Sequence, residues 1–196
     1  MFALLFLPSI LLQMCLCFPM KPVISAFEED QVTLHCICLI TDGQLFRLPE
    51  IFVPMYINDF HSPGEQIRQQ SQLCKNHIIS TSNMTQAVQI MTSNRIRKVG
   101  RTALILESYL PFGQLEKLVK TFKPFSNLAI FVKRQKIEGY TIFRFHYNDE
   151  NESTERGIEL VNILQKDKFQ LSNPIFINDE LYGMRGKSII LTSFEQ

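Results

Sequence analysis

Residues 101–133 alternate between strand-like and helical patterns, and this alternation constrains the fold more than any other feature. Residues 101–107 contain the compact apolar group ALIL, which is typical of a buried strand. Residues 111–124 begin and end with proline, and their apolar side chains recur at helical spacing. These side chains are Leu115, Leu118, Val119 and Phe122. Because residues 128–133 are again strand-like, the segment predicts a βαβ unit with its helix packed on a largely parallel sheet.

The rest of the chain adds strands and one weaker helix. Strand-like patterns occupy residues 32–40, 140–147 and 158–164. Residues 45–57 contain two prolines and therefore predict a loop or an edge segment. Residues 59–94 are polar and poorly periodic, and within them residues 65–73 are a modest helix candidate. Consecutive strands without helices between them indicate an antiparallel or mixed edge. We therefore expect an α/β fold with a mixed sheet and packed helices.

The organisation along the chain follows from shifts in composition. We expect a signal peptide at residues 1–17, an extracellular α/β domain at residues 18–165 and a connector at residues 166–186. The connector shows neither the helical nor the strand period of apolar residues. Residues 187–196 resemble the first strand of a further domain.

The first seventeen residues carry no charge and are rich in Leu, Phe and Ile, and the first charged side chain is Lys21. This apolar run is short for a bilayer-spanning helix, which needs roughly 20 residues, and Pro8 interrupts it. A secretory signal peptide with Cys15 and Cys17 before a cut near Phe18 fits better. An uncleaved anchor or a buried segment is the alternative.

The charge balance implies no charged class of partner. Twenty basic and 19 acidic residues give a formal net charge of +1, so nothing favours nucleic-acid binding, whereas 45% apolar residues suffice for a core.

Secretion would leave the mature chain with Cys36, Cys38 and Cys74 in an oxidising compartment. Cys36 and Cys38 lie two residues apart in a strand-like run, so both point to one face and compete for Cys74. The simplest outcome is one disulfide and one free thiol, and the alternative is three buried, apolar-like cysteines. Two glycosylation sequons, at Asn83 and Asn151, agree with secretion.

Motifs for catalysis, metal binding or nucleotide binding do not assemble. Gly186-Lys187-Ser188 lacks the earlier glycine of a phosphate loop and precedes a β-branched run. Cys36, Cys38, Cys74 and His77 have poor spacing for zinc, and the histidines, His35, His61, His77 and His146, show no pairing with Ser or Cys. The basic segment of residues 95–101 is expected to be a solvated loop or helix end, with a processing site or an anion contact as alternatives. We expect neither an enzyme nor a cofactor.

The C-terminal third resembles the insect ionotropic receptors, chemosensory relatives of ionotropic glutamate receptors. In that family the N-terminal region ends with a strand, an Asn-Pro-x-Phe connector and a glycine, followed by the first strand of the ligand-binding domain. Here residues 158–164 correspond to the strand that ends the N-terminal region. The connector corresponds to Asn173, Pro174, Ile175 and Phe176, the glycine to Gly186, and the first strand of the ligand-binding domain to Ile189, Leu191, Ser193, Phe194 and Glu195. Ile177 stands where the family often has proline, and Ser193 stands where threonine is usual.

The resemblance implies the N-terminal extracellular portion of a ligand-gated cation channel, with a reduced lobe like that of periplasmic binding proteins. The family's proline pair, ligand contacts and pore helices would all lie beyond Gln196. Its partners would be other receptor subunits, and it would reach the plasma membrane only through those later segments. The alternative is a small, self-contained secreted α/β binding protein.

Overall fold

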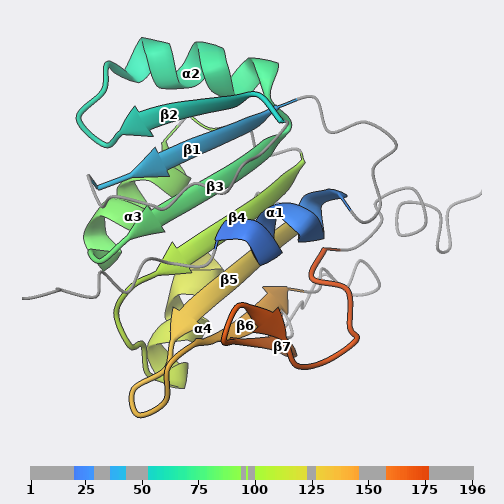
Figure 1. Ribbon diagram of the computed structural model, residues 1–196. Coiled ribbons are helices and arrows are strands. Elements are labelled where there is room, and N and C mark those ends of the chain that lie inside the picture. The colour runs from blue at the N-terminus through green and yellow to red at the C-terminus, as the bar shows by residue number, and fades with distance from the viewer. Residues whose placement is uncertain are drawn as a thin grey trace, which may run out of the picture.

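The computed structural model describes residues 20–28, 36–42, 53–93, 96, 100–122, 127–145 and 158–176. Within these ranges eight strands form one sheet in the order β2-β1-β3-β4-β5-β6-β7-β8 (Figure 1). The strands are β1 (Ile37–Thr41), β2 (Met55–Asp59), β3 (Asn76–Thr81), β4 (Arg101–Leu106), β5 (Asn127–Lys133), β6 (Tyr140–Phe145), β7 (Ile158–Gln165) and β8 (Lys168–Phe169). The helices are α1 (Met20–Glu28), α2 (Gly64–Leu73), α3 (Met84–Thr92) and α4 (Phe112–Thr121). The expected α/β fold with a mixed sheet is confirmed.

The sheet is parallel from β2 to β5 and antiparallel from β5 to β8. Every residue of β1, β3 and β4 is buried, as expected for parallel strands covered on both faces. From β1 the chain moves outward to β2 and then returns to β3 on the other side of β1. The strand order therefore reverses between β1 and β3, which is the topological switch point of a doubly wound sheet.

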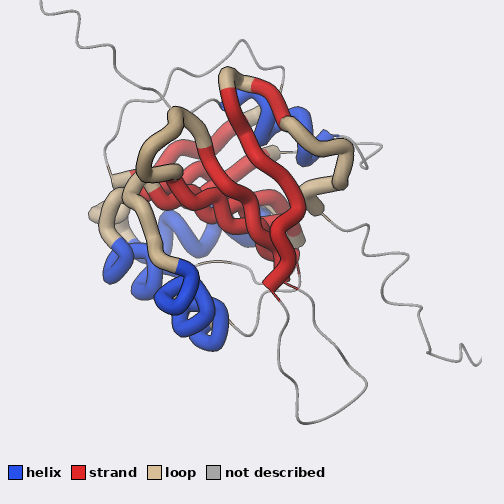
Figure 2. Tube along the Cα trace, turned by 90° about the horizontal axis from the view of Figure 1, so that it is seen from below, coloured by secondary structure: helices blue, strands red, loops and turns tan. Residues whose placement is uncertain are grey.

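Helices cover the two faces of the sheet unequally. The connections through α2, α3 and α4 all advance in the same direction along the sheet, and right-handed crossovers therefore place these helices on one face. Their apolar side chains pack on Cys38, Ile40, Leu104 and Ile130. The opposite face carries α1 together with Ile175 and Phe176. Figure 2 shows the strands as a middle layer between these two sets.

Two regular elements lie where the sequence analysis expected only polar, poorly periodic chain. They are β3 and α3, and the N-cap of α3 is Asn83, whose Oδ1 accepts a hydrogen bond of 2.9 Å from the Thr85 N–H. The segment containing α1 was also not predicted as a helix, although α1 buries Met20, Val23, Ile24 and Phe27.

Arg101 corrects the interpretation of residues 95–101 as a solvated segment. It begins β4, and only 4% of it is exposed. Its Nη1 donates a hydrogen bond of 3.1 Å to the carbonyl oxygen of Phe27, near the C-terminal end of α1, where helix carbonyls lack helical partners. Its guanidinium also lies 5.7 Å from the centre of the Phe176 ring, which stacks on Phe27. Arg101 thus joins α1, β4 and the segment around Phe176. Arg95, Arg97 and Lys98 lie outside the described residues.

Replacing Arg101 with methionine is expected to lower the free energy of unfolding by about 1.5–3 kcal/mol, because a buried carbonyl loses a charged donor while the aliphatic bulk is kept. Urea denaturation of the purified chain measures the change. Arg68→Met is the matched control, since Arg68 is exposed and pairs with the exposed Glu65, and it should have a much smaller effect. Equal losses in the two variants would contradict the role assigned to Arg101.

Candidate functional site

The carboxyl ends of the parallel strands place several polar side chains at one edge of the sheet. Asp42 follows β1, Ser82 follows β3, Glu107 follows β4 and Lys133 ends β5. Ligands of open α/β sheets bind at this edge, next to the switch point. The sequence analysis did not single out these residues. Its only usable signal was a polar residue directly after a buried apolar run, which becomes informative once the strand order is known.

Asp42 bridges β1 and β3 across the switch point. Its Oδ2 accepts hydrogen bonds from the Ser82 N–H (2.8 Å) and the Ser82 hydroxyl (3.0 Å), and it lies 3.3 Å from the Thr81 hydroxyl. Its other carboxylate oxygen, Oδ1, is buried without a hydrogen-bond partner among the described residues. The carboxylate therefore orients the start of the loop after β3, and its Oδ1 accepts no hydrogen bond from the described residues.

Glu107 occupies the equivalent position after β4, and its side chain is only 8% exposed. Its Oε2 accepts a hydrogen bond of 2.7 Å from the Tyr140 hydroxyl and lies 3.8 Å from Lys133 Nζ. Burial raises the pKa of Glu107 above its ordinary value; Tyr140 and Lys133 oppose this shift, whereas the charge of Asp42 adds to it. The pKa of Tyr140 is also raised, first by burial and then by the negative charge of Glu107. Tyr140 is therefore a protonated donor to Glu107.

Two cavities lie at this edge, on either side of the loop that joins β5 to β6. The first, here named the hairpin cavity, has a volume of about 360 Å³ and lies between this loop and the turn joining β7 to β8. The second has a volume of about 310 Å³ and lies toward α4. Tyr109, Phe112 and Ile137 line the second cavity, and each is about half exposed. The carboxyl edge thus combines buried carboxylates with two cavities that share the basic side chains Lys133, Arg134 and Lys136.

The three cysteines predicted to compete for one disulfide occupy the α2 side of the sheet. Cys36 and Cys74 form a disulfide with their Cα atoms 5.2 Å apart, which ties the start of β1 to the end of α2. Cys38 is a buried free thiol on the same face as Cys36. Burial raises the pKa of the Cys38 thiol to about 11, against the effect of the Asn58 amide, whose Nδ2 lies 3.7 Å from Cys38 Sγ. The sequence analysis judged the spacing of Cys36, Cys38, Cys74 and His77 poor for zinc, and the disulfide leaves Cys38 as the one thiol among these three cysteines.

His77 has a serine partner that the sequence analysis did not foresee. Its Nε2 lies 2.8 Å from the Ser71 hydroxyl, and both side chains are completely buried. A reacting serine must reach its substrate, so this pair holds α2 against β3 rather than forming a catalytic dyad. His61 is exposed and lines a third cavity of about 390 Å³ with Phe60 and residues of α3. His35 and His146 lie outside the described residues.

The remaining sequence predictions divide between exposed and undescribed positions. Asn83 is exposed, and its Oδ1 caps α3, a hydrogen bond that does not involve Nδ2, the atom to which an N-linked glycan is attached. Asn151, the expected signal peptide at residues 1–17 and residues 177–196, which contain Gly186 and the motif positions that follow it, lie outside the described residues. Within the described ranges no helix is long and apolar enough to cross a membrane, and no group of three or more His, Cys, Asp or Glu could hold a metal ion.

The first half of the segment expected as a connector is packed on the sheet. Lys166 and Asp167 form the turn from β7 to β8 with positive φ angles of 49° and 61°. Beyond β8 the chain returns across β7, and Ile175 and Phe176 enter the core on the α1 face. These residues therefore belong to the same folded unit as residues 127–165.

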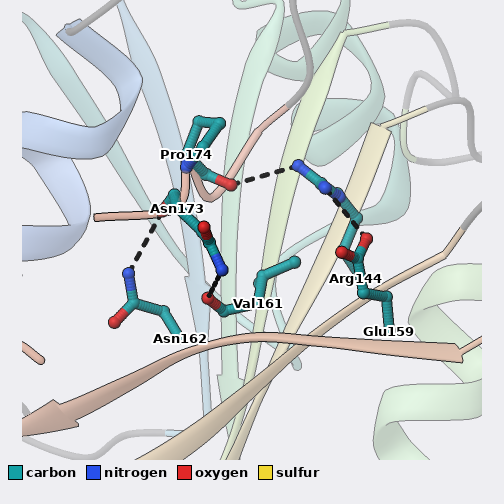
Figure 3. Close-up of polar contacts among 6 residues, drawn as sticks. All are labelled: Arg144, Glu159, Val161, Asn162, Asn173 and Pro174. Atoms are coloured by element: carbon teal, nitrogen blue, oxygen red, sulfur yellow. Dashed lines mark hydrogen bonds and ion pairs between the residues drawn. The ribbon is translucent and has the colours of Figure 1, made fainter. Parts of the chain in front are cut away.

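Asn162 holds this returning segment through its side-chain amide (Figure 3). Its Nδ2 donates to the carbonyl oxygens of Leu171 (2.8 Å) and Asn173 (3.1 Å), and its Oδ1 accepts from the Leu171 N–H (3.0 Å). A register shift between β6 and β7 leaves Val161 unpaired, and both Val161 and Asn162 are buried. The β-bulge thus explains why the polar side chain of Asn162 in β7 is buried and can bind the returning segment.

Asn173 and Pro174 make the reciprocal contacts. Asn173 Nδ2 donates a hydrogen bond of 3.2 Å to the Val161 carbonyl oxygen. Arg144 Nη1 donates one of 3.1 Å to the Pro174 carbonyl oxygen, and Arg144 Nη2 pairs with Glu159 at 2.9 Å (Figure 3). Residues 171–176, here named the exit segment, are thus fixed from both β6 and β7.

Comparisons with protein-family models, with curated proteins and with solved structures found no match to this chain.

Differential alkylation followed by mass spectrometry should distinguish the three cysteines. We expect Cys38 to stay unmodified in the native protein, because its thiol is buried and its pKa is raised, and to react once guanidinium unfolds the chain. Cys36 and Cys74 should react only after a reductant is added. Modification of Cys36 or Cys74 without a reductant would contradict the disulfide.

The pH dependence of stability should report the raised pKa of Glu107. Above the ordinary glutamate pKa of about 4.3 the unfolded chain loses this proton first, so the folded state binds more protons and stability falls as pH rises toward the folded pKa. Glu107→Gln removes this effect while keeping an acceptor for Tyr140. The stability of the variant relative to the parent should therefore increase between pH 4 and pH 7, as measured by urea denaturation at both values. A relative stability that decreases over this interval would contradict the assigned direction.

Proposed function

We propose that this chain is the extracellular N-terminal portion of a chemosensory ionotropic receptor, acting as a binding or assembly module without catalysis. The strand of residues 158–164 and the Asn-Pro-x-Phe positions that follow it support this assignment, because they resemble the family's junction with the ligand-binding domain.

The observation that carries the proposal is the docking of the exit segment. Three positions of the resembling motif have separate structural roles: Asn173 donates to β7, Pro174 accepts from Arg144, and Phe176 is buried beside Phe27. A chain anchored at successive residues leaves the domain in a fixed direction. A fixed exit direction suits a module whose movement must also move the domain that follows it in the chain.

The strand order supports a finer proposal for the fold. The order β2-β1-β3-β4-β5, with helices on both faces, is that of flavodoxin-like doubly wound sheets. We propose that the module is a reduced lobe of the periplasmic-binding-protein type, with an antiparallel extension formed by β6, β7 and β8. In such a lobe the ligand edge is the carboxyl edge, where Asp42, Ser82 and Glu107 lie.

The compartment and partners follow from the same proposal. An apolar leader, the Cys36–Cys74 disulfide and the exposed sequon at Asn83 support passage through the secretory pathway. Other receptor subunits are the proposed partners, and the plasma membrane would be reached only through segments beyond Gln196. Neither a cofactor nor a nucleic acid enters the proposal.

The second candidate is a self-contained secreted α/β binding protein. One observation favours it: the described residues cover both faces of the sheet, so the domain needs no second lobe to bury its core.

Sequencing the transcript downstream of the codon for Gln196 separates the two candidates. The receptor assignment predicts an open frame with a proline pair, the rest of a binding lobe and apolar spans of roughly 20 residues. A stop codon directly after Gln196 in full-length transcripts would overturn it and leave the secreted binding protein. The matched genomic DNA is the control, because it distinguishes a true stop from incomplete transcript sequence.

A further inference from the structure

We propose that two neighbouring turns at the carboxyl edge, β5–β6 and β7–β8, bind a sulfated polysaccharide of the heparin type. Five basic side chains gather on these turns, and they are named here the basic strip. They are Lys133, Arg134, Lys136, Lys166 and Lys168. The choice of a polysaccharide rests on the secretory route that both candidate functions share, whereas the site itself rests on the position and charge of these residues.

The pairing of four strands brings the two turns together. Lys133 of β5 pairs with Tyr140 of β6, which pairs with Leu164 of β7. Leu164 in turn pairs with Phe169 of β8. The chain between Lys133 and Tyr140 and the chain between Leu164 and Phe169 therefore leave the sheet side by side. Figure 1 shows the loop between β5 and β6 projecting beyond the end of the sheet.

Three cavities share the cations of the basic strip. Lys133, Arg134 and Lys136 line both the hairpin cavity and the second cavity. Lys166 lines the hairpin cavity and also, with Lys168, a further cavity of about 450 Å³. The cations are therefore spread over a surface wider than any one of these cavities. A small anion would meet only some of them, whereas a linear polyanion laid across the two turns meets all five.

The cations of the basic strip are accessible to a partner. Lys133 lies 3.8 Å from Glu107, yet 40% of its side chain is exposed. No ion pair within the described ranges involves the other four cations. Five cations thus stand against two acidic side chains on the same turns, Glu138 and Asp167, although the whole chain has a net charge of only +1. A local excess of cations attracts a polyanion and releases its counterions.

Backbone geometry fixes both turns before a partner arrives. The Arg134 N–H donates a hydrogen bond of 3.0 Å to the Gly139 carbonyl oxygen, which closes the loop. Gly139 has a φ of +127°, and a Cβ atom there would clash with the Leu164 carbonyl oxygen, so only glycine lets the loop approach β7 so closely. Lys166 and Asp167 are both left-handed, as in a two-residue hairpin turn. A backbone that is already ordered lowers the entropic cost of binding.

The sequence of the loop and the compartment favour sulfate groups as the anions. Residues 132–137 read VKRQKI, a basic run with one interruption, and short basic runs of this kind occur on heparin-binding surfaces. The Cys36–Cys74 disulfide is typical of chains that pass through an oxidising compartment. Sulfated polysaccharides are the linear polyanions that a protein meets on that route. RNA and anionic membranes are therefore the competing polyanions in the test.

Calorimetric titration of the purified chain with a size-defined heparin oligosaccharide tests the proposal. The controls are the same oligosaccharide without its sulfate groups, an oligoadenylate of matched charge, and vesicles of phosphatidylserine and phosphatidylcholine. We expect the sulfated oligosaccharide to bind at least about tenfold more tightly than each control. Absence of this binding, or equal binding of any control, would overturn the proposal.

The salt dependence of the same titration reports how many cations take part. Each cation that contacts a single-stranded polyanion releases roughly 0.7 counterions. A plot of log affinity against log NaCl concentration should therefore have a slope of about −3 to −4 for the basic strip. A slope near zero would overturn the electrostatic account.

Two double variants test whether both turns contribute. Arg134→Gln with Lys136→Gln removes two cations from the first turn, and Lys166→Asn with Lys168→Gln removes two from the second. Asparagine tolerates the left-handed backbone at position 166. We expect each double to lower the affinity by about tenfold and to make the salt slope less steep by about 1.4. A loss in only one of the two doubles would overturn the shared site.

A third double variant controls for net charge. Lys21→Gln with Lys75→Gln also removes two cations, at exposed positions that lie outside β5 to β8 and their turns, and should leave affinity and salt slope unchanged. A loss equal to that of the turn variants would overturn the location.

A charge-preserving variant separates lost contacts from a lost fold. Arg134→Lys with Lys136→Arg keeps both positive charges and should bind the oligosaccharide within about threefold of the parent, because the attraction depends mainly on charge. A loss as large as that of the glutamine double would contradict this. All these titrations use the present chain alone, so their outcome is separate from that of transcript sequencing.

Discussion

The sheet has two apolar faces, and its right-handed crossovers place helices on only one of them. Helices α2, α3 and α4 must lie together, because their connections advance in one direction. The other face, with Ile37, Ile78 and Phe131 at its centre, depends on segments from the two ends of the described chain, α1 and the exit segment. Arg101 joins these two segments by donating to α1 and stacking on Phe176. The closure of the second face thus rests on a buried cation that both segments share.

The sequence made the apolar, periodic elements predictable and hid those that bury polar groups. The ALIL strand was recognisable because a short continuous apolar run is typical of a strand buried on both faces, and the helix around Leu115 because its apolar side chains recur at helical spacing. β3 was missed because it buries Asn76, His77 and Ser80, and these polar side chains conceal a strand unless their partners are known. Ser71, on the preceding helix, is the partner of His77. Arg101 was misread for the same reason, since its acceptor lies 74 residues away.

The carboxyl edge could not be assembled from the sequence, because its members meet only through strand order. Asp42 and Ser82 are far apart in the chain and become neighbours because β1 pairs with β3. The sequence analysis did not single out residues 134–139, because the requirement for glycine at position 139 comes from the nearby Leu164 carbonyl oxygen. Likewise, the segment after residue 165 showed neither the helical nor the strand period. It is an irregular segment held by side-chain amide hydrogen bonds, and such a segment has no repeating pattern in its sequence. Local sequence patterns predict helices and strands, whereas a site at the strand ends can be predicted only when the order of the strands in the sheet is known.

Strand β7 connects the hairpin cavity to the exit segment. Leu164 lines the hairpin cavity, and Asn162, two residues earlier, holds Leu171 and Asn173. The turn that forms one cavity wall also leads directly into the exit segment through β8. The turn and the exit segment are therefore held by the same strand, so a displacement of one would act on the other, and linkage requires the two effects to have the same free energy. Because both lie at the β7–β8 edge of the sheet, such a displacement needs no rearrangement of the central strands.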